Sequence, residues 1–359
     1  MKIGLIGLPK SGKTSLFNLL TGSSVATSSF GASRGEMHAG IARVPDERVA
    51  RLSALFKPKK TTFATFEVVD LAGIAKGERQ GLDAKEFRNA DALLHVVRAF
   101  PDATGAAANP RSDIADLETE LILADLEVIE RRLERLEASL KKKRTDVEVK
   151  EQAILVKLKP ALESETPLRA LELPDEEAKA IRGFTFLSQK PILHCLNLAE
   201  KEIERGKTLV ESFGLAEVAG HPRTRLGWVS VVIEAEVAQL AGEEQAAFLA
   251  DLGLAEPAIK RILRDCYALL GLISFFTVGD DEVRAWSIRR GTHALDAAGV
   301  IHSDIARGFI RAEVVGYDEL IAAEGSMAAV RERGQFRLEG KEYVVQDGEI
   351  CHFRFNVAK

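Results

Sequence analysis

The chain has 359 residues, enough for two or three domains, and its 46% hydrophobic and 29% charged residues are typical of a globular protein. Its net charge of −5 gives no argument for nucleic-acid binding by the chain as a whole, and we expect no DNA partner. No run approaches the roughly 18–20 apolar residues of a membrane span and the N-terminus lacks a signal-peptide cleavage site, so we expect a cytoplasmic monomer with no membrane contact.

The N-terminal segment predicts a strand, a glycine-rich loop and a helix. Ile3, Leu5 and Ile6 form a short buried strand, residues 7–14 read GLPKSGKT and match G-x-x-x-x-G-K-[ST], and Gly22 stands where a helix would end. The backbone N–H groups of such a loop, and the positive end of the helix dipole behind it, bind phosphate. We therefore predict that a nucleotide is bound by Pro9, Lys10, Ser11, Gly12, Lys13, Thr14 and Ser15.

The stretch FATFEVVDLAG predicts the partner motif of this loop, a buried strand that ends in an acid. Asp70 is expected to bind Mg²⁺ together with the Thr14 hydroxyl. Lys13 would reach the β- and γ-phosphates and the Gly73 N–H would bond the γ-phosphate, so these two are the predicted catalytic groups. The next residue is Ile74, where Ras-like enzymes have a water-orienting Gln. Because Ile cannot polarise water, either hydrolysis is slow or another group supplies the attack geometry.

Four more stretches predict strands, at residues 38–44, 92–100, 191–197 and 227–232, with helical patterns between them. Such alternation is typical of a mostly parallel sheet with ligands at the carboxyl ends of its strands. The predicted fold class is therefore an α/β P-loop NTPase.

The base would be read where the strand at 191–197 continues as Asn197-Leu198-Ala199-Glu200. GTPases of this architecture have N-K-x-D there, and the Asp accepts two hydrogen bonds from guanine. Without the Lys, and with a longer acid, that discrimination is lost. The Asn197 amide can pair with adenine N6 and N7, which favours ATP or relaxed specificity. The alternative is that Asn197 caps the following helix, with Glu200 at the capping-box position.

Residues 113–163 predict a helical hairpin inserted into the nucleotide domain. A heptad pattern ends at KKKRTD, and a second apolar helix follows it. The tip residues Lys141, Lys142, Lys143 and Arg144 would contact RNA phosphates, or else form a solvated turn. The heptad positions are Ile122, Leu126, Ile129, Leu133, Leu136 and Leu140, opposite Ile154, Leu158 and Leu162.

The C-terminal residues from Ile273 onward predict a small β-grasp domain with one helix near THALDAAGVIH. Trp286 and Phe309 are expected in its core, the pair Arg289–Arg290 in solvent, and His302 in a structural role. The three cysteines are far apart in the sequence, which predicts small core residues rather than a disulfide or zinc site: Cys195, Cys266 and Cys351.

The chain as a whole resembles the Obg-like ATPase family, also called YchF, within the translation-factor class of P-loop GTPases. The resemblance is carried by GLPKSGKTSLFNLLTG, VVDLAGIAKG, DALLHVVRAF, the N-x-x-E at 197–200, VIEAEVAQL, and a tail similar to the TGS domain of that family. It implies a Mg²⁺-dependent hydrolase that prefers ATP to GTP, has a hydrophobic residue in place of the Ras Gln and associates with ribosomes. It also implies that Ser230, Val231 and Val232 face the edge of the base, beside Asn197, Leu198 and Glu200.

Two departures from the family pattern indicate a divergent member. Lys10 and Ser11 replace the Asn and Val of the usual phosphate loop, which leaves a dependence on K⁺ open. The stretch FGASRGEMHAG at 30–40 lacks the Thr that binds Mg²⁺ in the family. Its direct counterpart is Ala32, and Ser33 is the predicted substitute ligand.

These observations give a domain plan and three functional hypotheses. The nucleotide domain spans 1–112 and 184–242, the helical hairpin 113–183, connecting helices 243–272, and a TGS-like β-grasp domain 273–359. The leading hypothesis is a slow, ribosome-associated ATPase that regulates translation or a stress response. The alternatives are a regulatory protein that binds nucleotide without hydrolysing it, and a protein that binds GTP.

Overall fold

A computed structural model describes residues 1–25, 38–70 and 85–356. The chain forms two compact units, one of residues 1–41 and 67–269 and the other of residues 42–66 and 270–359. No helix within the described ranges is long and apolar enough to cross a membrane.

The first unit is built on a sheet of six strands in the order β2-β4-β1-β5-β6-β7, in which the five strands from β4 to β7 run parallel. The strands β1, β4, β5 and β6 are largely buried, as expected for a parallel sheet with helices on both faces. Their bounds are β1 Lys2–Ile6, β2 His38–Arg43, β4 Thr65–Asp70, β5 Ala92–Ala99, β6 Ile192–Leu198 and β7 Thr224–Val229. The predicted strand at 227–232 is therefore wrong in its bounds, since Val231 already begins a helix.

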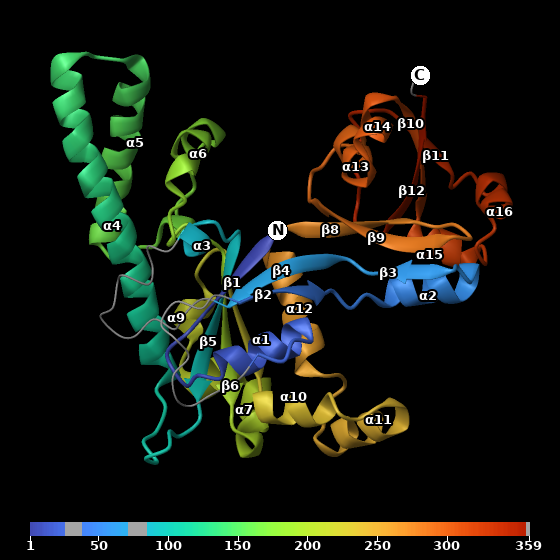
Figure 1. The fold of residues 1–359 in the computed structure, drawn as a ribbon, viewed down its shortest axis with the longest axis horizontal. Coiled ribbons are helices and arrows are strands. Elements are labelled where there is room, and N and C mark those ends of the chain that lie inside the picture. Colours follow the sequence, from blue (N-terminus) through green and yellow to red (C-terminus); the bar gives the residue numbers. More distant parts are fainter. Residues whose placement is uncertain (26–37, 71–84, 357–359) are drawn as a thin grey trace. The chain divides into compact units, whose positions relative to one another are not determined.

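The helices of this unit lie between and after its strands in the chain, and some of them pack against the sheet (Figure 1). They are α1 Lys13–Thr21, α3 Lys85–Arg88, α4 Pro110–Lys142, α5 Asp146–Glu163, α6 Asp175–Ile181, α7 Ile203–Lys207, α8 Leu209–Phe213, α9 Ala216–Ala219, α10 Val231–Val237, α11 Gly242–Asp251 and α12 Ala258–Leu269. Short 3₁₀ turns occupy Leu168–Ala170, Arg182–Phe184 and Glu200–Glu202. Helix α1 ends at Gly22, whose φ of 67° is left-handed, as the sequence predicts.

Helices α4 and α5 form the predicted antiparallel hairpin, which projects from the sheet (Figure 1). Its core contains Ile122, Ile129 and Leu136 of α4 against Ile154 and Leu158 of α5, as the heptad pattern predicts. At the root, both carboxylate oxygens of Asp125 accept backbone hydrogen bonds, from Leu187 at 2.8 Å and Ser188 at 2.7 Å. The four cations of the tip, Lys141–Arg144, are exposed.

The second unit is a mixed sheet in the order β11-β10-β12-β8-β9-β3, with α13 packed on β9 and β10. Phe309 is buried in its core and Trp286 packs against that core partly buried, while Arg289 and Arg290 are exposed, as expected. His302 accepts a backbone hydrogen bond from Asp304 at 3.1 Å and so caps α14. The bounds are β3 Lys60–Thr62, β8 Leu272–Thr277, β9 Glu282–Arg289, β10 Phe309–Gly316, β11 Arg337–Glu339, β12 Glu349–Phe355, α2 Glu47–Phe56, α13 Ala294–Ile301, α14 Ser303–Arg307, α15 Tyr317–Ala322 and α16 Met327–Glu332.

Residues 42–66 belong to the second unit, whereas the predicted domain plan assigned them to the nucleotide domain. Strand β3 extends the second sheet by pairing in parallel with β9, and α2 packs on β9. Arg48 of α2 holds this packing, because its guanidinium lies 5.1 Å from the centre of the Phe276 ring and donates to Asp347 at 2.8 Å. The apolar positions of α2 predict a helix but do not specify which of the two sheets it covers.

Candidate nucleotide-binding site

The glycine-rich loop joins β1 to α1, and its backbone conformation requires glycine at residue 12. Gly12 has a φ of 93° and precedes the first residue of α1. A Cβ atom there would also lie 2.3 Å from Asn197 Nδ2. A Cβ atom at Gly7 would lie 2.6 Å from the carbonyl oxygen of Val96 on β5. The loop is thus seated closely on the strands β5 and β6.

Three predicted phosphate and metal residues come together at the end of this loop. Lys13 Nζ forms an ion pair with Asp70 Oδ1, and the Thr14 hydroxyl donates to Asp70 Oδ2 at 3.2 Å. Asp70 is the last residue of β4 and is only 4% exposed. A hydroxyl and a carboxylate are hard oxygen ligands of the type that Mg²⁺ prefers, so the residues present fit this ion.

The remaining residues of the loop differ in how far they are exposed. Pro9 and Lys10 are exposed, and Lys10 adopts a left-handed φ of 64°. Ser11 is 1% exposed and its hydroxyl has no hydrogen-bond partner within the described residues. Ser15 is half-buried in the first turn of α1.

Asn197 is the last buried polar residue of β6, and its amide joins two loops. Nδ2 donates to the Ser11 carbonyl at 2.9 Å, and Oδ1 accepts from the Val231 N–H at 3.1 Å. The alternative of a helix cap is wrong, because the 3₁₀ turn that follows is preceded by Ala199 and has no side-chain cap. Glu200 is exposed in that turn.

Bidentate pairing of the Asn197 amide with adenine is constrained by these contacts, since one donor and one acceptor position already bond to protein. Leu198 beside it is buried. On the neighbouring β7–α10 junction, Ser230 is 1% exposed and Val231 is buried, whereas the side chain of Val232 is 60% exposed. Of the three residues predicted at the base edge, only Val232 presents its side chain to solvent.

Three predicted positions lie outside the described residues. They are Ser33, the substitute metal ligand, Gly73, the γ-phosphate donor, and Ile74, which stands in place of the Ras Gln.

A buried polar cluster beside the phosphate loop was not predicted. His95 of β5 and His194 of β6 are paired in the sheet register and contact each other through Nδ1 atoms at 3.0 Å. Glu118 Oε1 of α4 lies 3.2 Å from His194 Nε2 and pairs with the buried Arg169. Arg169 Nε in turn donates to Thr224 at 3.1 Å. The sequence signal was one histidine at the middle of each of two adjacent strands, in ALLHVVRAF and PILHCLN.

The ionisation of this cluster follows from its burial and its charges. Burial, together with the neighbouring His194, lowers the pKa of His95 well below its ordinary value. Burial opposes ionisation of Glu118, but its contact with His194 and the charge of Arg169 prevail and lower its pKa to about 2. Burial lowers the pKa of His194 as well. The cluster therefore contains one carboxylate, one guanidinium and two neutral imidazoles.

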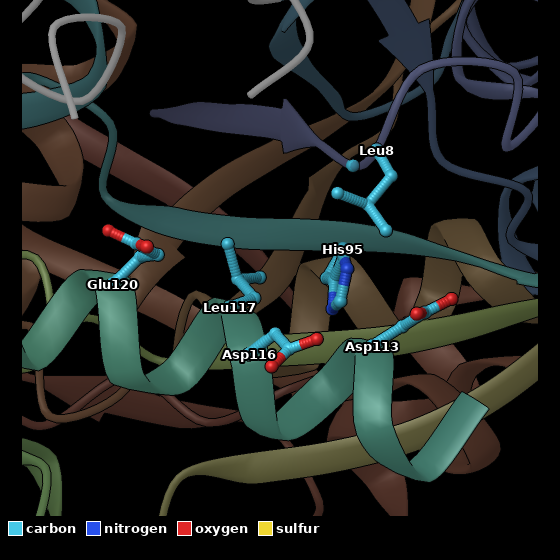
Figure 2. A pocket seen from close by; sticks show the side chains of 7 residues that line it. Leu8, His95, Asp113, Asp116, Leu117 and Glu120 are labelled. Atoms are coloured by element: carbon cyan, nitrogen blue, oxygen red, sulfur yellow. The ribbon is translucent and has the colours of Figure 1, made fainter. Parts of the chain in front are cut away.

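A small cavity connects His95 with the phosphate loop (Figure 2). Its walls are the first two loop residues, Gly7 and Leu8, the His95 ring, and the N-terminal half of α4. Figure 2 shows His95 between the loop and the acidic face of that helix. The helix contributes Asp113, Asp116, Leu117 and Glu120.

The three cysteines are buried and free, as predicted for core residues. Burial raises the pKa of the Cys195 thiol to about 12. They take no part in the site.

Two family models match the chain. The model described as "50S ribosome-binding GTPase" matches residues 2–132, and the YchF-GTPase_C model, described as a protein of unknown function, matches residues 272–356.

Relatives match over the full length. "Ribosome-binding ATPase YchF" of Bacillus subtilis (strain 168) is 42% identical over 363 residues, covering 99% of both chains. The protein of the same name from Escherichia coli O157:H7 is 38% identical over 365 residues, again covering 99% of both. The solved structure of the Schizosaccharomyces pombe YchF GTPase superposes with a TM-score of 0.84 at 29% identity, covering 99% of this chain and 97% of that one.

Proposed function

Since the chain belongs to the YchF family, we propose that it is a Mg²⁺-dependent hydrolase that prefers ATP to GTP and works on the ribosome. The observation that carries the proposal is the convergence of Lys13 and Thr14 on Asp70 at the end of the phosphate loop. The relatives named ribosome-binding ATPases match along 99% of their length, so every part of the chain has a counterpart in them. A ribosomal partner also favours the cytoplasm as the site of action.

The phosphate end of the site divides the chemistry among a few groups. Loop N–H groups and Lys13 would hold the β- and γ-phosphates, and Thr14 with Asp70 would hold Mg²⁺, which neutralises phosphate charge. Ser33 and Gly73 are proposed to complete the metal and γ-phosphate contacts. Because phosphoryl transfer needs little covalent chemistry from the protein, positioning and electrostatic stabilisation would supply most of the rate.

The base end of the site supports ATP rather than GTP. Glu200 is exposed two residues after the end of β6, where a shorter Asp would accept from guanine in N-K-x-D enzymes. Asn197 would present the remaining hydrogen of Nδ2 to the base while it holds the loops at Ser11 and Val231. Its proposed role thus includes loop alignment as well as contact with adenine.

The hairpin tip is the proposed contact with ribosomal RNA. Lys141, Lys142, Lys143 and Arg144 are adjacent and exposed at the far end of two packed helices. The chain carries a net charge of −5, so this local concentration of positive charge is opposite in sign to the net charge of the chain. Phosphate contacts by such a cluster would bind without sequence specificity and weaken with salt.

The decisive experiment is single-turnover hydrolysis of ATP and GTP, with and without ribosomes, alongside calorimetric titration of both nucleotides with Mg²⁺. We expect tighter binding of ATP and turnover that ribosomes accelerate and that Lys13→Ala abolishes. Binding without turnover under every condition would make the chain a nucleotide-dependent binding protein. GTP binding at least about tenfold tighter than ATP would overturn the base assignment.

A further inference from the structure

Strand β7 forms one edge of the first sheet, where it pairs with β6 on one side. The Ile192 N–H donates to the Arg223 carbonyl at 3.0 Å, which sets the phase of this parallel ladder. In a parallel pair, alternate residues bond to the neighbouring strand, so every second residue from Arg223 onward turns its backbone groups to β6. The intervening residues Leu226 and Trp228 therefore turn their N–H and C=O groups away from the sheet.

One of these outward groups is occupied by a side chain. Arg261 of α12 donates to the Trp228 carbonyl at 2.9 Å, and its guanidinium lies 4.6 Å from the centre of the Trp228 ring. The ring also rests against Gly206 of α7, where a Cβ atom would lie 2.4 Å from it. Within the part of the chain that the structure describes, the N–H and C=O of Leu226 and the N–H of Trp228 have no partner outside the sheet. The edge thus keeps two donors and one acceptor for another strand.

A groove of about 630 Å³ opens onto these backbone groups. Leu226, Gly227 and Trp228 of β7 all line it, and the other lining residues come from α7 and α8 and from α12 with the turn before it. Its volume is that of a ligand site rather than of a packing defect. Because helices border the edge, a second copy of the chain would have to bring its own helices against them. A single extended segment fits this edge better.

The charges of the groove indicate which segment would bind. Glu211 of α8 is exposed and has no ion pair with any described side chain, although it lines the groove. Leu209 and Leu254 add apolar surface. The other charged lining groups are already partnered: Lys207 with Glu204, Glu256 with Arg264, Asp265 with Arg225, and Arg261 with the Trp228 carbonyl. The charge left to be complemented is therefore negative.

We propose that the free edge of β7 binds an extended peptide segment of a partner protein, which adds a strand to the first sheet and carries a basic side chain that pairs with Glu211. The peptide backbone donates to the Leu226 carbonyl and accepts from the N–H groups of Leu226 and Trp228, as in other cases of strand addition. Its apolar side chains contact the leucines of the groove. This surface lies outside the phosphate loop, and the proposal does not depend on nucleotide hydrolysis.

The main test selects ligands for the full chain from a phage-displayed library of random ten-residue peptides. We expect enriched sequences that alternate apolar with polar residues and contain Lys or Arg. Synthetic capped copies should change the fluorescence of the Trp286→Phe chain, in which Trp228 is the single tryptophan. N-methylation of the peptide amide that bonds to the Leu226 carbonyl should weaken binding at least about tenfold, because it removes that hydrogen bond.

A charge exchange tests the role of Glu211. Glu211→Lys should weaken binding of a selected basic peptide at least about threefold, and a peptide with Glu in place of its basic residue should bind this variant better than the parent chain. Glu244→Lys is the matched control, because Glu244 is an exposed acid on α11 that does not line the groove. Equal affinities of the basic peptide for the parent chain and Glu211→Lys would overturn the pairing.

A last measurement uses the unsubstituted chain and so does not depend on the folding of a variant. Nitrogen-15 NMR should show slower solvent exchange of the Leu226 and Trp228 amides when a selected peptide is bound. Failure of the library to yield a binder, or binding that leaves both amides unchanged, would overturn the proposal. Dimerisation of the chain that protects these amides without any peptide would assign the edge to a second copy and also overturn it.

Discussion

Gly12 and Asn197 approach each other so closely that a Cβ atom at residue 12 would lie 2.3 Å from the Asn197 Nδ2 atom. The same amide nitrogen donates to the carbonyl of Ser11, the residue before the glycine. A residue 185 positions further along the chain therefore fixes the path of the phosphate loop. Several properties of the site depend on this contact.

Gly12→Ala should abolish nucleotide binding while leaving most of the fold intact. The substitution places a Cβ atom against Asn197 and forces alanine into a φ of 93°. Calorimetry with ATP and Mg²⁺ measures the loss, and circular dichroism checks the fold. Gly22→Ala is the matched control at the other end of α1, because its φ is 67° but nothing lies within 4 Å of the added Cβ. That variant should lose stability and keep its affinity; equal affinity in both variants would contradict the prediction.

Asn197→Ala should weaken ATP and GTP binding by the same factor if the amide acts mainly by aligning loops. It would leave the Ser11 carbonyl and the Val231 N–H without their present partner, at about 1–3 kcal/mol for each buried group. Titration of both nucleotides gives the two affinities, and thermal unfolding gives the stability. A loss confined to ATP would instead identify Asn197 as the residue that discriminates the base.

Asp125→Asn should change how stability depends on pH. Burial raises the pKa of Asp125 from 3.8 to about 6, so the folded state holds this proton more tightly than the unfolded state does. Its contribution to the free energy of unfolding therefore falls as pH rises from about 4 to about 6, and is constant above that. The stability of the parent chain minus that of the variant should fall across the same window in urea titrations.

Neutralising the hairpin tip should weaken ribosome binding without changing basal hydrolysis. Replacing the residues Lys141–Arg144 by Gln removes four exposed cations at the end of the hairpin. We expect at least a tenfold loss of affinity near physiological salt and a smaller dependence of binding on salt concentration. Sedimentation with ribosomes over a series of salt concentrations measures both. The variant with Arg289→Gln and Arg290→Gln tests a second exposed basic pair; an equal loss there would argue against a specific role for the tip.

Arg48→Leu should loosen the packing of α2 in the second unit. The substitution retains an apolar contact with Phe276 but removes the hydrogen bonds to Asp347, at a cost of about 1–2 kcal/mol. Hydrogen exchange of the β8 and β9 amides should be faster as a result. Arg51→Leu, an exposed neighbour on the same helix, should leave these rates unchanged. No change in Arg48→Leu would show that α2 does not contribute to the stability of this sheet.

Sequence reasoning recovered the features that depend on neighbouring residues. The phosphate loop, the end of β4 at Asp70 and the helix stop at Gly22 follow from local patterns of glycine, charge and apolar residues. The hairpin followed as well, because a heptad repeat specifies both a helix and the face that it buries. The family models and the relatives then confirmed the P-loop fold and the resemblance as a whole.

What the sequence could not supply is the identity of partners far apart in the chain. The sequence does not distinguish whether the Asn197 side chain caps a helix, pairs with a base or bonds to Ser11 and Val231. Only the fold selects among these roles. Likewise, Val49 and Leu52 predict a buried face of α2 but do not indicate which sheet that face packs against. The His95–His194 pair depends on the register of two strands that are separated by a long insertion.

The placement of residues 42–66 in the second unit also means that this segment can fold only late in the synthesis of the chain. This segment emerges early, but its sheet partners begin at residue 270, after residues 67–269 have been made. At about 5–20 residues per second, the ribosome needs on the order of 10–40 s for that interval. During this time, α2 and β3 have no native surface to pack on, whereas the flanking strands β2 and β4 can already pair with each other, and β4 with β1. The segment is therefore an expected binding site for chaperones during translation, and the second unit can complete its fold only when the chain is nearly finished.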